Sequence, residues 1–199
     1  GVMNYEYNKW EKFVTPDMDI EIPFTRMLAG SVDYHLGGFR ALPVSKFIVQ
    51  NSKPYVMGTR CHMLAMYVVL ENYQGMVCDY PDAYIGQRGF EVLQNIPATW
   101  DETHVPNAEV GKFVSIARRK NSTWFIGSIT NNTARDIKVN LKFLPAGKYT
   151  AVIYSDADDA GENADHLTKK TTIVDKATVL KLKLAPGGGN VIILNKLKK

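Results

Sequence analysis

The hydrophobic pattern of this chain changes near residue 98, and this change limits the possible folds more than any other feature. Beyond it, apolar and polar residues alternate in seven short runs: KFVSIARR (112–119), TWFIGSIT (123–130), DIKVNLKF (136–143), KYTAVIYS (148–155), KTTIVD (170–175), TVLKLKL (178–184) and NVIILN (190–195). Turn-forming residues such as Asn131-Asn132 and Pro186-Gly187-Gly188-Gly189 separate the runs. This alternation and spacing predict an antiparallel β-sandwich over residues 99–199.

The first 98 residues follow another pattern. Residues 22–29 (IPFTRMLA) are typical of a short buried strand, and residues 83–95 have helical spacing. Residues 57–74 (MGTRCHMLAMYVVLENYQ) predict a long helix that is apolar on nearly all sides and therefore buried on more than one side. One strand and one long apolar helix cannot close a core, because their apolar faces need strands from elsewhere.

We therefore predict an α/β plus all-β chain in two parts. Residues 1–98 are expected to be the last strand and helix of a (β/α)8 barrel whose other strands belong to a longer protein. Residues 99–199 are expected to form a C-terminal antiparallel β-sandwich. The first part should then expose apolar side chains where the rest of the barrel belongs.

Charge and hydropathy exclude two classes of partner. Residues 1–98 carry a balance of −2 and residues 99–199 a balance of +6. In KVNLKF and VLKLKL the lysines alternate with apolar residues, which is typical of the solvated face of a strand, so we expect no nucleic-acid partner. The longest apolar run, MLAMYVVL at 63–70, is too short for a membrane span.

Several reactive residues have structural interpretations. Cys61 lies in an apolar helical pattern and is expected to be a buried thiol. The acidic loop at 155–165 lacks the spacing of an EF-hand and is expected to be solvated. Asp101, Glu102 and His104 resemble a catalytic cluster, but we interpret them as charged residues of a strand that links the two parts.

Two strings near the start carry more specific information. GVMNYEYN (1–8) and IPFTRMLAGSVDYHLGGF (22–39) resemble the end of the catalytic barrel of glycoside hydrolase family 97, which reads Glu-Gly-Val-x-x-x-Glu-(Tyr/Phe)-Asn and then Pro-Phe-Thr-Arg-Met-Leu-Ala-Gly. The string TWDETHVPNAEVGKFVSIARRKNSTWFIGSITNNT (99–133) resembles the start of the C-terminal β domain of that family. The resemblance covers essentially the whole chain.

The resemblance implies an exo-acting enzyme that hydrolyses α-glucosidic or α-galactosidic bonds of an oligosaccharide or glycoside and is periplasmic or secreted. Glu6 matches the general acid of the family, and the resemblance implies that this acid or its near neighbour in the motif is one of several glutamate ligands to calcium. The remaining calcium ligands and the second carboxyl group that hydrolysis needs would lie in the rest of the barrel. We therefore expect the chain alone to be inactive and to bind calcium poorly.

The residues themselves leave alternatives open. Glu6 lies between two tyrosines, which suits an acid with a raised pKa, but it also suits a solvated loop carboxylate. Arg26 lies inside the apolar run FTRMLAG, which is expected to be a strand, and is either a structural ion-pair partner or a substrate contact. Asp33 and His35 are candidate substrate-binding residues of the loop after residues 22–29, or they pack within that loop.

A rival from another functional class is a non-catalytic carbohydrate-binding or structural sandwich. Such a module would need exposed aromatic side chains on one face of the sheet. Four residues are candidates: Trp124, Phe125, Tyr149 and Tyr154. Their mixed spacing predicts that most of them lie in the core.

Overall fold

The computed structural model describes residues 3–4, 12–32, 34–35, 38–53, 55–77 and 79–197. The helices and 3₁₀ turns are α1 (Pro16–Phe24), η2 (Arg26–Ala29), η3 (Val44–Lys46), α2 (Arg60–Val69), η4 (Pro81–Ala83) and α3 (Phe90–Asn95). The strands are β1 (Met3–Asn4), β2 (Tyr34–His35), β3 (Arg40–Leu42), β4 (Tyr55–Met57), β5 (Glu102–Glu109), β6 (Phe113–Lys120), β7 (Thr123–Thr130), β8 (Arg135–Asn140), β9 (Tyr149–Asp156), β10 (Leu167–Val174), β11 (Val179–Leu184) and β12 (Gly189–Lys196).

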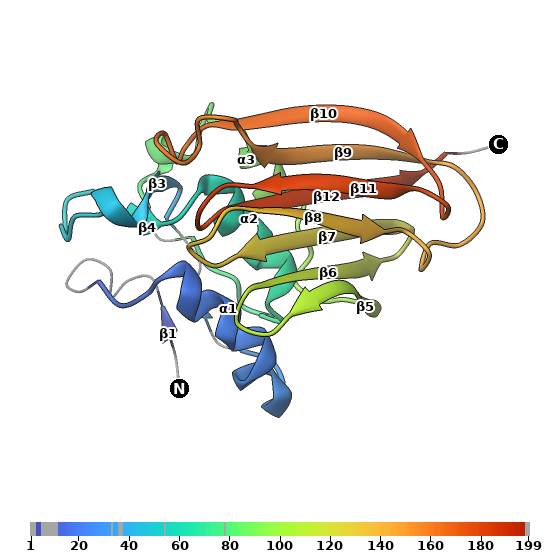
Figure 1. The fold of residues 1–199 in the computed structure, drawn as a ribbon, viewed down its shortest axis with the longest axis horizontal. Coiled ribbons are helices and arrows are strands. Elements are labelled where there is room, and N and C mark those ends of the chain that lie inside the picture. The colour runs from blue at the N-terminus through green and yellow to red at the C-terminus, as the bar shows by residue number, and fades with distance from the viewer. Residues whose placement is uncertain are drawn as a thin grey trace.

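The alternating runs of the second half form the strands that the sequence predicts. Six strands make one antiparallel sheet in the order β10-β9-β12-β7-β6-β5, and β8 pairs with β11 in a separate two-stranded sheet. Figure 1 shows this pair in front of the large sheet, whose two edges are β10 and β5. The register between β7 and β12 places Ile126 opposite Ile192, so both apolar side chains point to the same face.

The face of the large sheet that β8 and β11 cover is an apolar sandwich core. Trp124 and Ile126 of β7 are at most 2% exposed there. The covering pair contributes Ile137, Val139, Leu182 and Leu184. This packing confirms the predicted sandwich, because the apolar residues of both sheets face one another.

Helices cover the opposite face of the same sheet. α2 lies behind the sheet in Figure 1, against β7 and β12. Its approach requires glycine at two positions: a Cβ on Gly127 would lie 2.6 Å from the Ala65 carbonyl oxygen, and one on Gly189 would lie 2.6 Å from His62 Cα. One core therefore joins residues before and after position 98, including Leu64, Ile116 and other buried side chains.

Two expectations for the first half need correction. Residues 22–29 do not form a strand: α1 runs to Phe24, and the 3₁₀ turn η2 follows. Thr15 accepts a hydrogen bond from the Met18 amide at 3.3 Å, and Pro16 occupies the first turn, which is a strong helix-start signal. The predicted helix at 57–74 exists, but it begins after the Thr59 cap and ends at Val69.

The short strands of the first half pair in parallel. β1 pairs with β2, with α1 between them in the chain, and β3 pairs with β4, which is followed by α2. Several apolar side chains of this half are exposed, including Leu28, Ile48 and Ile85. In the described part of the chain, no helix is long and apolar enough to cross a membrane.

Candidate functional site

The predicted site residues of the first half are only partly described. Glu6 and Asp33 lie outside the described residues, and for His35 the structure gives the β2 backbone alone. Arg26 is described and belongs to the η2 turn, not to a strand. Its Nη1 atom is buried and has no hydrogen-bond partner among the residues that the structure describes.

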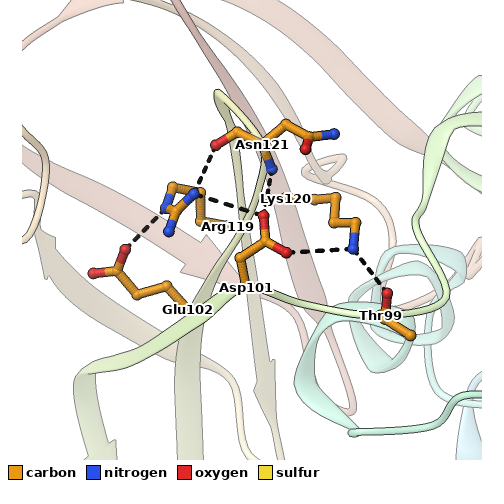
Figure 2. Close-up of polar contacts among 6 residues, drawn as sticks. All are labelled: Thr99, Asp101, Glu102, Arg119, Lys120 and Asn121. Atoms are coloured by element: carbon orange, nitrogen blue, oxygen red, sulfur yellow. Dashed lines mark hydrogen bonds and ion pairs between the residues drawn. The ribbon is translucent and has the colours of Figure 1, made fainter.

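The cluster formed by Asp101, Glu102 and their partners ties the start of β5 to the β6–β7 turn. Asp101 Oδ2 accepts a hydrogen bond from the Asn121 amide at 2.7 Å, and Glu102 Oε2 accepts one from Arg119 Nε at 2.8 Å (Figure 2). Asn121 has a φ of 53°, a left-handed conformation that asparagine tolerates. These contacts support the structural interpretation of the cluster.

Proton donors hold the acidic side chains of this cluster in their charged form. The Asn121 amide lowers the pKa of Asp101, and hydrogen bonds from His104 and Arg119 lower the pKa of Glu102. His104 Nε2 lies 2.8 Å from Glu102 Oε1, and its ring stacks on Phe143. A carboxyl group with a lowered pKa is a poor proton donor at neutral pH, so this cluster does not suit a general acid.

Arg118 connects the sheet to the end of α2. Its side chain is buried, and its guanidinium donates to the Val68 carbonyl at 2.7 Å and to the Val69 carbonyl at 3.2 Å. The last carbonyls of a helix have no partner within the helix, and a cation there also complements the helix dipole. Arg118 therefore caps α2 from β6.

A buried His–Asp pair lies where α1, α2 and the β11–β12 turn meet. His62 Nε2 is 3.1 Å from Asp19 Oδ2, and His62 Nδ1 is 3.2 Å from the Gly188 carbonyl oxygen. Because a carbonyl oxygen only accepts hydrogen bonds, His62 Nδ1 must carry a proton. A second proton then lies in the hydrogen bond between His62 Nε2 and Asp19 Oδ2. Both side chains are fully buried, so the pair has no access to a substrate.

Asp156 is the second polar connection at this junction. Its Oδ1 accepts from the Thr59 hydroxyl at 2.7 Å, and its Oδ2 accepts from the amides of Ala185 and Gly189 at 2.9 and 3.0 Å. Burial raises the pKa of Asp156 to about 6, although the three hydrogen bonds and the nearby His62 act in the opposite direction. Asp156 thus joins β9, the cap of α2 and the β11–β12 turn.

A cavity of about 590 Å³ is lined in part by Arg60 and Asp165. Arg60 donates to the Phe39 carbonyl at 2.9 Å and lies 3.1 Å from Asp165 Oδ1, so its charge already has partners. Within the described ranges, no group of three or more His, Cys, Asp or Glu side chains could hold a metal ion. The contacts of Arg60 and Asp165 are therefore structural connections.

The candidate aromatic platform is also absent from the surface. Trp124, Phe125, Tyr149 and Tyr154 are all at most 4% exposed, as the sequence predicts for most of them. Cys61 is a buried free thiol, which is likewise confirmed. The roles of His62 and Arg118 were missed because Asp19 lies 43 residues from His62 and Val68 lies 50 residues from Arg118 in the sequence.

Known proteins are similar to this chain over its second half or over most of its length. Residues 99–195 match the family model described as "Glycosyl-hydrolase 97 C-terminal, oligomerisation". The chain is 35% identical over 192 residues to a retaining alpha-galactosidase of Bacteroides thetaiotaomicron, covering 95% of this chain and 29% of the relative. It is 25% identical over 171 residues to a probable retaining alpha-galactosidase of Streptomyces bingchenggensis, covering 84% and 24%.

Solved structures give the same relationship. A glycoside hydrolase family 97 enzyme from Pseudoalteromonas sp. strain K8 in complex with acarbose has a TM-score of 0.85 and 30% identity, covering 98% of this chain and 31% of that chain. An E480Q form in complex with panose has the same TM-score with 29% identity and the same coverage. The chain thus spans less than a third of the length of these relatives.

Proposed function

Because this chain belongs to glycoside hydrolase family 97, we propose that it is the C-terminal portion of an exo-acting enzyme that hydrolyses α-galactosidic or α-glucosidic bonds. The observation that carries this proposal is the extent of the similarity, which includes the helical half as well as the sheet. A separate sugar-binding sandwich would be similar to these enzymes over the sheet alone. The names of both curated relatives favour α-galactosides and a retaining mechanism.

The first half supports the proposal that residues 1–98 complete a catalytic barrel. Parallel strands connected by a helix, as in β1-α1-β2, are the repeating unit of such a barrel. Parallel sheets in proteins are nearly always covered on both faces. The parallel pairs β1–β2 and β3–β4 and the exposed Leu28 and Ile85 are consistent with further strands supplied by a longer protein.

We propose that Glu6 donates the proton to the leaving group, as the resemblance implies. A retaining glycosidase needs a second carboxylate about 5 Å away that attacks the sugar. The rest of the barrel would supply it, together with most ligands of the calcium ion that the resemblance implies. Glu6 is the residue of this chain that the resemblance would place near that calcium ion.

The test is a hybrid enzyme in which this chain replaces the matching residues of the Bacteroides relative. We expect the hybrid to hydrolyse an aryl α-galactoside and an α-galactosyl disaccharide. Glu6→Gln should reduce the rate on the disaccharide by roughly 10²–10⁴-fold, because its poor leaving group needs a proton. The loss on the aryl galactoside should be much smaller, because a phenolate leaves with little help.

Glu21→Gln is the matched control, since Glu21 is an exposed carboxylate of α1. It should leave both rates unchanged. A folded, active hybrid in which Glu6→Gln has no effect on either substrate would reject Glu6 as the acid. Hydrolysis by the 199-residue chain alone would show that both carboxyl groups lie within it, and Asp33 would then be the first residue to replace.

Residues 99–195 carry a second role under this proposal. Their family model is described by oligomerisation, so we propose that this part of the chain joins copies of the enzyme. The alternative, a sugar-binding surface, has weaker support because the four candidate aromatic residues are buried. Light scattering of the purified chain should show a mass above that of one copy.

A further inference from the structure

The two edges of the large sheet differ in how they are protected. On β5, the register shifts between His104 and Asn107, and Pro106 removes a backbone donor. The neighbouring strand β8 is held to this edge, because Asn107 Nδ2 donates to the Lys138 carbonyl at 2.9 Å and Asn140 Nδ2 to the Pro106 carbonyl at 3.3 Å. A bulge and a proline are typical of edges that do not accept another strand.

The β10 edge has neither a bulge nor a proline, and at its start Arg88 Nη1 donates to the Leu167 carbonyl at 3.2 Å. β10 pairs with β9 over all eight residues without a register shift and contains no proline. Residues 168–171 are exposed, and Ile173 is 63% exposed. A groove of about 420 Å³ separates β10 from β11, with Ile153, Val174 and Leu182 among its lining residues. On this side of the sandwich, β10 ends the large sheet and β11 ends the two-stranded sheet, so each strand has one unpaired edge within the described residues (Figure 1).

We propose that a second copy of this chain adds its own β10 to this edge, antiparallel and across a two-fold axis, so that the two large sheets become one. The proposal rests on the proposed oligomerisation role of residues 99–195. Strand addition satisfies the unpaired backbone groups of both edges at once. A two-fold axis makes the same surface serve on both copies, which is the commonest arrangement in homodimers.

The sequence of β10 selects one register. A two-fold axis perpendicular to the sheet pairs one central residue with itself, and only registers centred on Lys170 or Thr171 use nearly the whole strand. The first places two lysine side chains directly opposite each other, which is unfavourable. The second places Thr171 opposite Thr171, Lys170 opposite Thr172 and Lys169 opposite Ile173. We therefore assign Thr171 to the axis.

Charges on β10 predict how the dimer responds to salt. Lys169 is already engaged within its own copy, since its Nζ lies 2.9 Å from Glu91 Oε1 and 5.2 Å from the centre of the Tyr154 ring. In the chosen register the two Lys170 side chains are diagonal neighbours, a separation of about 7–8 Å. Added salt should screen their repulsion and strengthen the dimer, and Lys170→Thr should have the same effect at low salt.

The decisive test is a disulfide cross-link at the axis. Cys78 is first replaced by Ser, so that the buried Cys61 is the one native cysteine left in the chain. Directly opposite residues of antiparallel strands have Cα atoms about 4.5–5.5 Å apart, which a disulfide can bridge. Thr171→Cys should therefore form a covalent dimer under mild oxidation. Lys169→Cys is the matched control on the same face of β10 and should not, because the two Cys side chains would lie four positions apart along the strands.

A negative charge introduced at each edge tests the same inference without a cross-link. Thr171→Glu places two carboxylates opposite each other and should lower the dimer fraction at least about tenfold in sedimentation velocity, while the melting temperature of the monomer changes little because Thr171 is exposed. Val105→Glu introduces the same charge at an exposed position on β5 and should leave the dimer unchanged.

The outcomes separate this inference from the proposed function. Dimer loss in Val105→Glu but not in Thr171→Glu would place the interface on β5 and overturn the inference. A strictly monomeric chain that gives no Thr171→Cys cross-link would overturn it as well. In either case an active hybrid that depends on Glu6 would leave the proposed hydrolase function intact.

Discussion

The two faces of the large sheet are covered in different ways. On the face covered by β8 and β11, the buried polar side chains are uncharged, such as Ser115 and Ser128, whose hydroxyls lie 2.8 Å apart. On the face covered by α1 and α2, the buried polar set includes His62, Asp19 and Arg118. All the charged side chains that the described core buries lie on this helical side.

The difference reflects how the covering elements satisfy their backbones. Strands β8 and β11 pair with each other and bring apolar side chains to the core, while Asn140 and Arg135 at the two ends of β8 make hydrogen bonds to the large sheet. A helix leaves carbonyls and amides unpaired at its ends, and the sheet must supply partners where those ends are buried. Arg118 does this for the end of α2, and Asp156 holds the Thr59 cap at its start. The helical face therefore depends on particular polar side chains, and single substitutions there should lower the stability of the protein more than on the other face.

The largest effect is expected for Gly127→Val. Its Cβ would overlap the Ala65 carbonyl oxygen and would lie 2.8 Å from Val68 Cβ, so α2 would have to move away from the sheet. We expect a loss of about 5 kcal/mol or more in the free energy of unfolding, measured by urea denaturation. The neighbouring Ile126→Ala, on the opposite face of β7, should cost about 3 kcal/mol through a cavity.

These two variants also test whether the faces form one cooperative unit. Because β7 belongs to both cores, each variant should unfold in a single transition that fluorescence and circular dichroism report alike. A Gly127→Val protein that keeps its sheet signal while the helical signal is lost would show that the sandwich is stable without the helices.

The next effect is expected for Arg118→Met. The substitution keeps much of the apolar stem but leaves the Val68 and Val69 carbonyls without their partner. Buried unsatisfied acceptors cost about 1–3 kcal/mol each, so we expect a loss of about 3 kcal/mol. Arg118→Lys should recover part of it. Equal stability of wild type and Arg118→Met would reject the capping role.

The third prediction concerns pH. The pKa of Asp156 is about 6 in the folded protein, above its ordinary value of 3.8, so the folded state binds this proton more tightly than the unfolded state. The contribution of Asp156 to the free energy of unfolding should therefore decrease by about 3 kcal/mol as the pH rises from about 4 to about 6, and stay constant above that range.

Asp156→Asn should remove this dependence, because the amide resembles the protonated carboxyl group. The difference in stability between variant and wild type should therefore change in favour of the variant between pH 4 and pH 6. Asp158→Asn, at an exposed position of the same loop, is the matched control and should keep the wild-type profile. Parallel profiles for wild type and Asp156→Asn would contradict the raised pKa.

The sequence predicts the large sheet well and the first half poorly, for physical reasons. Period-two alternation is a local signal, and each of the seven alternating runs contains a strand. In β5 the exposed Val105 and Pro106 interrupt that pattern where the register shifts, and its role as an edge strand depends on pairing with β6. α1 was missed because an apolar run outweighed the Thr15-Pro16 start signal.

The polar contacts of the helical face lie beyond local reasoning. Arg118 lies in the string at 99–133 that resembles the family. The carbonyls to which it donates at the end of α2, however, lie 50 and 49 residues earlier in the sequence. Asp156 was assigned to a solvated loop because its neighbours are acidic, yet Thr59 and the β11–β12 turn bind its carboxylate. The predictions for Glu6, Asp33 and His35 still await a test.

The smallest effect is expected at the Asp101 cluster, which lies outside both cores. Asp101→Ala removes the acceptor of the Asn121 amide, so that amide should exchange faster with solvent, while the melting temperature falls less than for Gly127→Val or Arg118→Met. Because the pKa of Asp101 is lowered, its contribution is present at neutral pH and is lost as the pH falls below about 4. Glu102→Gln removes the charge that faces Arg119 but leaves the hydrogen bond from the Asn121 amide to Asp101 in place. It should therefore leave the exchange of the Asn121 amide unchanged. Unchanged exchange in Asp101→Ala would mean that the left-handed turn at Asn121 holds without the aspartate.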